Sequence, residues 1–202
     1  MREKELRLAL ICYGGISLAV YMHGITKEIW HLLRASRAFH AGEKPLQGSE
    51  AVYRDFLEVI LESTGLKLRV FSDIITGASA GGINGIFLAN AIATGQSLAP
   101  LTNLWLQDAD IETLLDPDAR ALKRFTKFWA TPIAWLATRK PGGTVDKTVG
   151  VEARAEVRAK LSQFVRARWF EPPFGGVVFY NLLLSAFDAM AAAGGGPTLI
   201  PD

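Results

Sequence analysis

The sequence of 202 residues has few of the residues that build metal or disulfide sites. Its single cysteine, Cys12, excludes an intramolecular disulfide and any metal site that needs several cysteines. The three histidines all lie between residues 23 and 40, which leaves little material for a histidine-rich metal cluster. We therefore expect neither a metal ion nor a cofactor.

Long hydrophobic runs are also missing. No stretch of about 20 apolar residues could cross a bilayer, and the opening MREKELRLALICYGG is too charged, with too short an apolar core, for a signal peptide. Half of the residues are nevertheless hydrophobic and 21% are charged, so a sizeable core is expected and global disorder is not. These observations favour a cytoplasmic protein.

Charge is unevenly distributed although the formal net charge is only +2. Residues 117–169 hold 12 Lys/Arg and 4 Asp/Glu, a local balance of +8, and the rest of the chain is acidic. This block is either a solvated helix face or a surface for an anionic partner. The Trp and Phe residues within this block either pack into the protein core along one face of each helix, or they belong to amphipathic helices that lie on an anionic membrane. Nucleic-acid binding is disfavoured for two reasons. The sequence pI of about 8.7 is below that of strongly basic nucleic-acid-binding domains, and the sequence contains no known nucleic-acid-binding motif.

The first half of the chain reads as alternating strands and helices. Residues 6–11 form an aliphatic run that predicts a buried strand, and 66–75 predict a second strand. Apolar residues recur at helical spacing over 18–33 and 53–61, with Gly65 as a natural stop, and 83–93 predict a buried helix. Two strands joined through helices favour parallel pairing, and therefore an α/β fold.

The second half reads as helical. Amphipathic patterns cover 122–136 and 151–169, and a last helix is expected over 177–193. We place a nucleophile region at 1–110 and a helical continuation at 111–202, with a linker near 140–150. Only two strands can be identified where an α/β sheet usually has about five or six, and 198–202 could begin another. We therefore expect the sheet to be incomplete in this chain.

The sharpest local signal is a G-x-S-x-G pentapeptide, Gly77 to Gly81, between a predicted strand and a predicted helix. This context is the one that a nucleophile elbow requires, because small residues must flank a serine held on a tight turn. Ser79 is the candidate nucleophile, and the following helix would direct its N-terminal N–H groups towards the serine. The alternative is a glycine-rich turn with an incidental serine.

No histidine follows Ser79, so a Ser-His-Asp triad in the chain order of the α/β-hydrolases is excluded. His23, His31 and His40 all precede the serine and are expected to be structural. A serine–aspartate dyad remains possible. Gly14 and Gly15, directly after the first strand, could supply the N–H groups of an oxyanion hole at the same edge of the sheet.

These two glycine loops, Tyr13 to Ala19 and Gly77 to Gly82, resemble those of the patatin-like phospholipase family, over roughly residues 6–95. The resemblance implies a three-layer α/β/α fold with a mainly parallel sheet. It also implies hydrolysis of lipid acyl esters by a Ser-Asp dyad, with Ser79 as nucleophile and the Gly14 and Gly15 amides as oxyanion hole. A phospholipid or another lipid ester would be the substrate, at the surface of a membrane.

Two departures from the family pattern stand out. The first loop keeps only its two central glycines, and Ser17 occupies the position of an arginine. The family base lies in an Asp-Gly pair, which this sequence lacks. The later aspartates, none followed by glycine, are Asp108, Asp110, Asp116, Asp118, Asp146, Asp188 and Asp202. Asp146 is the least poor substitute, and we expect the dyad aspartate to lie beyond residue 202.

The sequence therefore predicts a lipid acyl hydrolase whose 202 residues alone have little or no activity. Two alternatives remain open. One is a non-catalytic fragment or pseudoenzyme that keeps a lipid-binding or membrane-surface role. The other is nucleotide binding, for which the sequence gives little support because neither a P-loop nor a complete G-x-G-x-x-G occurs.

Overall fold

The computed structural model describes residues 2–15, 18–43, 47–107 and 176–201. The chain divides into two compact units, Met1–Ala109 with Leu184–Asp202, and Asp110–Leu183. Nearly all of the described residues belong to the first unit, since only 176–183 of the second are described. The expected helices at 122–136 and 151–169, the linker near 140–150 and the basic block all lie outside the described residues.

Two parallel strands form the sheet. β1 (Arg2–Cys12) pairs with β2 (Leu66–Gly77), with Arg2 opposite Leu66 and Cys12 opposite Gly77. An irregularity between Leu8 and Ala9 shifts the register once. The expected parallel pairing is confirmed, and the fold is mixed α/β.

Five helices accompany the sheet in the described residues: α1 (Ala19–Ala41), α2 (Ser49–Thr64), α3 (Ala80–Thr94), α4 (Leu101–Gln107) and α9 (Gly176–Ala192). Gly42, Gly65 and Gly95 end the first three in the left-handed conformation that glycine adopts without a steric penalty. The predicted stop at Gly65 is confirmed. The short α4 was not predicted, because seven residues hardly establish a helical period.

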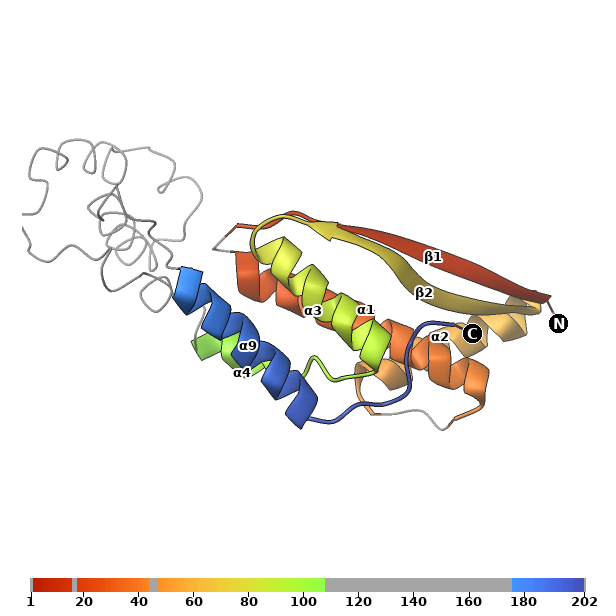
Figure 1. Ribbon diagram of the computed structural model, residues 1–202. Coiled ribbons are helices and arrows are strands. Elements are labelled where there is room, and N and C mark those ends of the chain that lie inside the picture. The colour runs from red at the N-terminus through yellow and green to blue at the C-terminus, as the bar shows by residue number, and fades with distance from the viewer. Residues whose placement is uncertain (1, 16–17, 44–46, 108–175, 202) are drawn as a thin grey trace, which may run out of the picture. The chain divides into compact units, whose positions relative to one another are not determined.

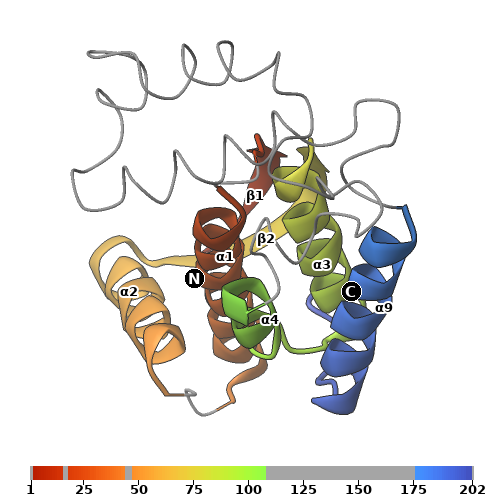
Figure 2. The same ribbon diagram turned by 90° about the vertical axis from the view of Figure 1, so that its left-hand side faces the viewer.

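The helices α1, α2 and α3 lie along one face of the sheet (Figures 1 and 2). α4 packs against α1 and α3, where the rings of Trp105 and Phe87 lie 6.4 Å apart. α3 carries many of the most buried side chains, as its apolar sequence predicted. The largest side chains that are almost completely inaccessible are Leu33, Leu57, Phe87, Leu88, Leu98, Leu101 and Met190.

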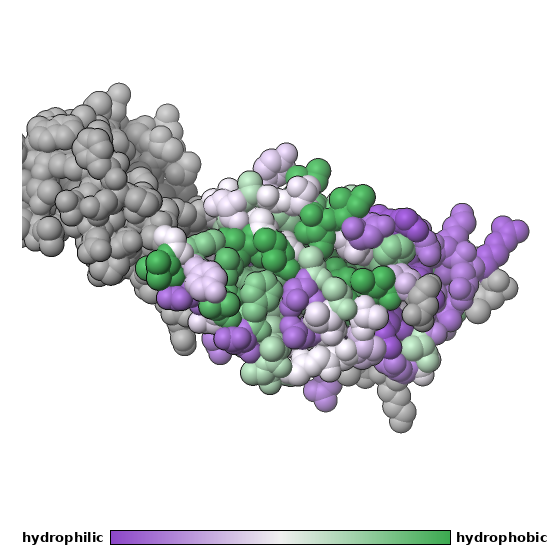
Figure 3. All heavy atoms as spheres, in the orientation of Figure 1, coloured by the Kyte–Doolittle hydropathy of each residue, from purple (hydrophilic) through white to green (hydrophobic). Residues whose placement is uncertain are grey.

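β1 is exposed along most of its length, so the prediction of a buried strand is wrong in that respect. Leu6 and Ile11 are 45% and 65% exposed, and the charged half of the strand lies in a hydrophilic region of the surface of the first unit (Figure 3). The physical reason is that β1 is an edge strand, and in the described residues the helices cover one face of the sheet. An aliphatic run predicts a strand, but it does not reveal whether both faces are covered.

The end of the chain packs against α3. Leu199 is buried, and its amide donates to the carbonyl oxygen of Ile92 (2.8 Å), to which the Thr198 hydroxyl also donates. The sequence left open that another strand begins at 198–202, and no strand forms over the described residues 198–201.

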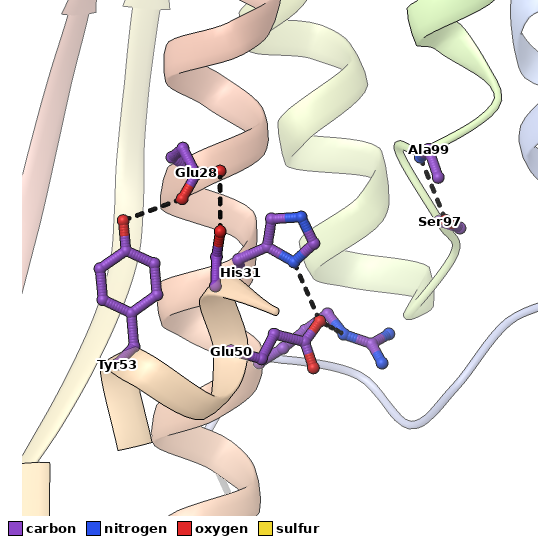
Figure 4. A network of polar contacts seen from close by, with 8 residues as sticks. Glu28, His31, Glu50, Tyr53, Ser97 and Ala99 are labelled. Atoms are coloured by element: carbon purple, nitrogen blue, oxygen red, sulfur yellow. Dashed lines mark hydrogen bonds and ion pairs between the residues drawn. The ribbon is translucent and has the colours of Figure 1, made fainter. Parts of the chain in front are cut away.

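A buried carboxylate joins α1 to α2. Glu50, 5% exposed, accepts hydrogen bonds from His31 Nδ1 (3.0 Å) and Arg34 Nε (2.7 Å) through the same oxygen (Figure 4). One turn away, Glu28 accepts from the hydroxyl of Tyr53 (3.0 Å). These bonds fix α1, which begins just after the first glycine loop, against its neighbour.

Candidate active site

Both glycine loops leave the sheet at the same edge. Cys12 and Gly77 lie opposite each other as the last residues of the two strands, so Tyr13–Gly15 and Ala78–Ser79 begin side by side. The amide of Ala78 donates to the carbonyl oxygen of Cys12 at 3.1 Å. The expected meeting of the two loops at the carboxyl edge of a parallel sheet is therefore observed.

The backbones of the two loops are in direct contact, which explains why several positions in them are glycine. A Cβ on Gly14 would overlap the carbonyl oxygen of Ala78 and the amide nitrogen of Gly81, and one on Gly81 would overlap the carbonyl group of Cys12. A Cβ on Gly77 would come within 2.8 Å of that same carbonyl oxygen. The sequence predicted that Gly77 and Gly81 leave room for the serine turn, and the structure shows that they also admit the first loop.

Ser79 has a strained backbone. Its φ of 53° and ψ of −133° make it the one non-glycine residue with positive φ among those described. Such a conformation costs on the order of 1–3 kcal/mol and is kept only where the surrounding structure enforces it. Strain of this kind, on an exposed serine between a strand and a helix, is the geometry of a nucleophile elbow.

The Ser79 hydroxyl is not used as a helix cap. Ser79 occupies the N-cap position of α3, where a serine usually accepts a hydrogen bond from the first turn, yet it makes no such bond. Instead the amides of Gly81 and Gly82 donate to the carbonyl oxygen of Ala78, at 3.1 and 3.2 Å. The hydroxyl thus stays available at the positive end of the helix dipole.

Backbone N–H groups of both loops lie beside the serine turn. The amide of Ala80 is the first of α3, where helix geometry supplies no intrahelical acceptor. Gly14 packs against the turn, and a Cβ on Gly15 would meet nothing within 4 Å, so this glycine borders open space. The arrangement can present several N–H donors to an anion that develops next to Ser79.

Asn84 is a residue of this region that sequence reasoning missed. It is 1% exposed, and its Nδ2 donates to the carbonyl oxygens of Ala19 (3.2 Å) and Ala80 (3.0 Å). It thereby ties the first turn of α3 to the start of α1, that is, the segments that follow the two loops. The available signal was an amide side chain within an otherwise apolar helix pattern.

The three histidines have structural partners. His23 Nε2 shares a hydrogen bond with Thr102 Oγ1 (3.0 Å), to which Lys27 also donates. Burial, and secondarily Lys27, lowers the pKa of His23 to about 4. His31 binds Glu50, and His40 donates to the carbonyl oxygen of Leu68 (3.2 Å). Within the described ranges none of them bonds to Ser79.

No carboxylate among the described residues bonds to Ser79. Asp73 is paired with Arg7 (3.5 Å) on the sheet, and Asp188 belongs to α9. Asp146, the least poor substitute for the base, lies outside the described residues, as do Asp108, Asp110, Asp116, Asp118 and Asp202. The geometry thus shows a strained serine turn beside amide donors, and it shows no base in the described part.

Cys12 is buried at the end of β1, and burial raises the pKa of its thiol, so it is no competing nucleophile. The described residues contain no group of three or more His, Cys, Asp or Glu side chains that could hold a metal ion. They also contain no helix that is both long and apolar enough to cross a membrane.

Comparison with known proteins gives one curated relative. The chain is 38% identical over 121 residues to the Uncharacterized membrane protein Rv3479 of Mycobacterium tuberculosis (strain ATCC 25618 / H37Rv). The match covers 56% of this chain and 11% of that protein, so the chain spans about a tenth of its relative's length. No protein-family model and no solved structure matches the chain.

Proposed function

We propose that the chain carries the nucleophile region of a serine acyl hydrolase that cleaves lipid carboxylic esters, as its resemblance to the patatin-like phospholipases implies. The observation that supports this most is the strained backbone of Ser79 on the β2–α3 turn, packed against Gly14. A turn that only reversed the chain would place glycine at this φ, which costs less. Keeping a serine there is explained if the hydroxyl reacts.

In the proposed reaction, Ser79 Oγ attacks the ester carbonyl carbon while a base removes its proton. The oxyanion of the tetrahedral intermediate accepts hydrogen bonds from the amides of Gly14 and Gly15, and from that of Ala80. The intermediate collapses to an acyl-enzyme as the protonated base gives its proton to the leaving oxygen, which departs as the alcohol. Water then repeats the attack, and the carboxylic acid leaves.

The proposed base is an aspartate from outside the described residues. None of the described carboxylates reaches Ser79, and the three histidines have other partners. The described residues would therefore supply the nucleophile and the amide donors, and another part of the protein would supply the base. In the complete enzyme the two strands would belong to a three-layer α/β/α sandwich with a larger, mainly parallel sheet.

The proposed substrate is a phospholipid or a similar lipid ester, which reaches the enzyme at the surface of a membrane. Support for membrane contact comes from the aromatic, basic block at 117–169, and the name of the mycobacterial relative agrees with it. The enzyme would act from the cytoplasm as a peripheral protein.

Fatty-acid release from phospholipid vesicles by the full-length protein tests the proposal. Ser79→Ala should lower the rate by about 1,000-fold or more, whereas Ser63→Ala, a change at an exposed serine of α2, should leave it unchanged. Equal rates for Ser79→Ala and the wild type would refute the role of Ser79. Vesicle binding without any hydrolysis by the folded wild type would favour the non-catalytic alternative.

A further inference from the structure

Each of the two glycine loops leads into a helix, and these two helices pack against each other. α1 begins at Ala19, shortly after Gly15, and α3 begins at Ala80, directly after Ser79. The two helices lie side by side on the same face of the sheet (Figure 2). The positions of their first turns therefore determine how closely the amides of the first loop approach the serine turn.

The side chain of Asn84 joins these two first turns. Its Nδ2 group donates to the carbonyl oxygen of Ala80 in α3 (3.0 Å) and to that of Ala19 in α1 (3.2 Å). Both neighbours are acceptors only, so the NH₂ group and not the amide oxygen must face them. Because the side chain is 1% exposed, water cannot readily replace these bonds if they are lost.

The first loop is bonded to the serine side of the site at both of its ends. At the strand end, the carbonyl oxygen of Cys12 accepts from the serine turn at 3.1 Å. At the helix end, the amide of Leu18 donates to the carbonyl oxygen of Gly15 (2.9 Å), and the next residue is Ala19, which Asn84 binds. The amides proposed as oxyanion donors lie between these two attachments.

Stability alone does not explain an asparagine at this position. Asn84 is the one polar side chain among the buried residues of α3, where Phe87 and Leu88 are typical neighbours in the sequence. A buried hydrogen bond adds only about 1 kcal/mol to the net stability, whereas a displacement of about 1 Å in an active site can lower the rate by about 100-fold. The asparagine is therefore better explained by the position that it fixes.

We propose that Asn84 is a positioning residue, which holds the loop of Gly14 and Gly15 against the serine turn so that its amides stay within reach of the oxyanion. Its effect on catalysis rests on the proposed hydrolase function. The oxyanion develops in the transition state, and the bound ester does not yet carry this charge. Loss of Asn84 should therefore lower kcat and leave KM nearly unchanged.

Hydrolysis of the soluble ester p-nitrophenyl butyrate by the full-length protein tests this effect. Asn84→Ser keeps a hydroxyl that can donate to the Ala80 carbonyl, but its side chain is too short to reach Ala19. We expect kcat to fall by about 10- to 100-fold and KM to change by less than about twofold. Asn90→Ala is the matched control, because it removes an asparagine of the same helix whose amide donates to Gln96 (2.8 Å). It should leave kcat unchanged.

Amide hydrogen exchange in the same full-length proteins tests the positioning itself and requires no activity. In Asn84→Ser the peptide that covers residues 13–19, which includes the bonded Leu18 amide, should exchange faster than in the wild type by about tenfold or more. Asn90→Ala should leave this exchange unchanged. Asn84→Ala should behave as Asn84→Ser does, so either folded variant is sufficient.

The two measurements separate this inference from the proposed function. Faster loop exchange in a protein whose wild type hydrolyses no ester would refute the hydrolase and uphold the positioning role of Asn84. Unchanged loop exchange in a folded Asn84 variant would overturn the inference. A higher KM at an unchanged kcat, in an active protein, would overturn it as well.

Discussion

The amide nitrogen of Ala78 lies 3.1 Å from the carbonyl oxygen of Cys12 and donates a hydrogen bond to it. This bond joins the serine turn to the glycine loop at the point where the two parallel strands end. It places a strained serine, the first amides of α3 and the amides of Gly14 and Gly15 in one small region. The contact between the two loops requires glycine at positions where a Cβ would overlap the opposite backbone. We can therefore predict the effect of adding a side chain there.

Gly81→Ala should unfold or strongly destabilise the protein. The new Cβ would overlap the Cys12 carbonyl group, and two backbones cannot separate without breaking the strand pair. We expect a loss of at least about 2 kcal/mol in the free energy of unfolding, measured by urea denaturation. Gly24→Ala is the matched control, since its Cβ meets nothing within 4 Å and it lies inside α1. That change should stabilise the protein by about 0.5–1 kcal/mol.

Ser79→Gly should be more stable than Ser79→Ala by about 1 kcal/mol. Both changes remove the hydroxyl, but only glycine relieves the strain of a φ of 53°. Thermal unfolding of the two variants measures the difference. At Ala89, an exposed helical position of α3, glycine should instead lower stability relative to alanine. A Ser79→Gly variant that is less stable than Ser79→Ala would show that the turn is unstrained.

The pH dependence of stability should carry a contribution from His23. Its pKa is lowered to about 4 in the folded protein, so between pH 4 and 6.5 the unfolded chain binds more protons than the folded one. This contribution is fully present above pH 6.5 and is lost as the pH falls. Between pH 7.5 and 4.5, His23→Gln should lose about 2 kcal/mol less than the wild type does. Equal losses in the two proteins would mean that His23 is protonated while folded.

The packing of α1 against α2, and with it the stability of the protein, should depend on Glu50. Glu50→Ala leaves His31 and Arg34 without their shared acceptor, and we expect a loss of about 2–3 kcal/mol in the free energy of unfolding. Glu62→Ala, at an exposed position of the same helix, should change it by less than about 0.5 kcal/mol. Similar effects at both positions would contradict the role of the buried carboxylate.

The sequence was sufficient to predict what depends on local pattern. Aliphatic runs marked β1 and β2, Gly65 marked the end of α2, and the G-x-S-x-G pentapeptide marked the turn at Ser79. It could not show that β1 lies exposed, because burial depends on which faces other segments cover. Nor could it show that Gly14 and Gly81 each admit the backbone of the other loop, since that contact joins residues more than 60 positions apart.

One further feature escaped prediction for a similar reason. Asn84 acts through carbonyl oxygens on two helices, and a single polar residue in an apolar pattern does not reveal its partners. The identity of the base stays a prediction, because the aspartate expected for it lies outside the described residues.

Labelling with a fluorophosphonate probe asks directly whether Ser79 is a nucleophile, because the probe phosphonylates a serine that an active site has activated. In the full-length protein we expect a covalent adduct that peptide mass spectrometry locates at Ser79, with fluoride released and no labelling of Ser79→Ala. Labelling of Ser79→Ala to the same extent, or a folded wild-type protein that stays unlabelled, would contradict the assignment of Ser79 as the nucleophile.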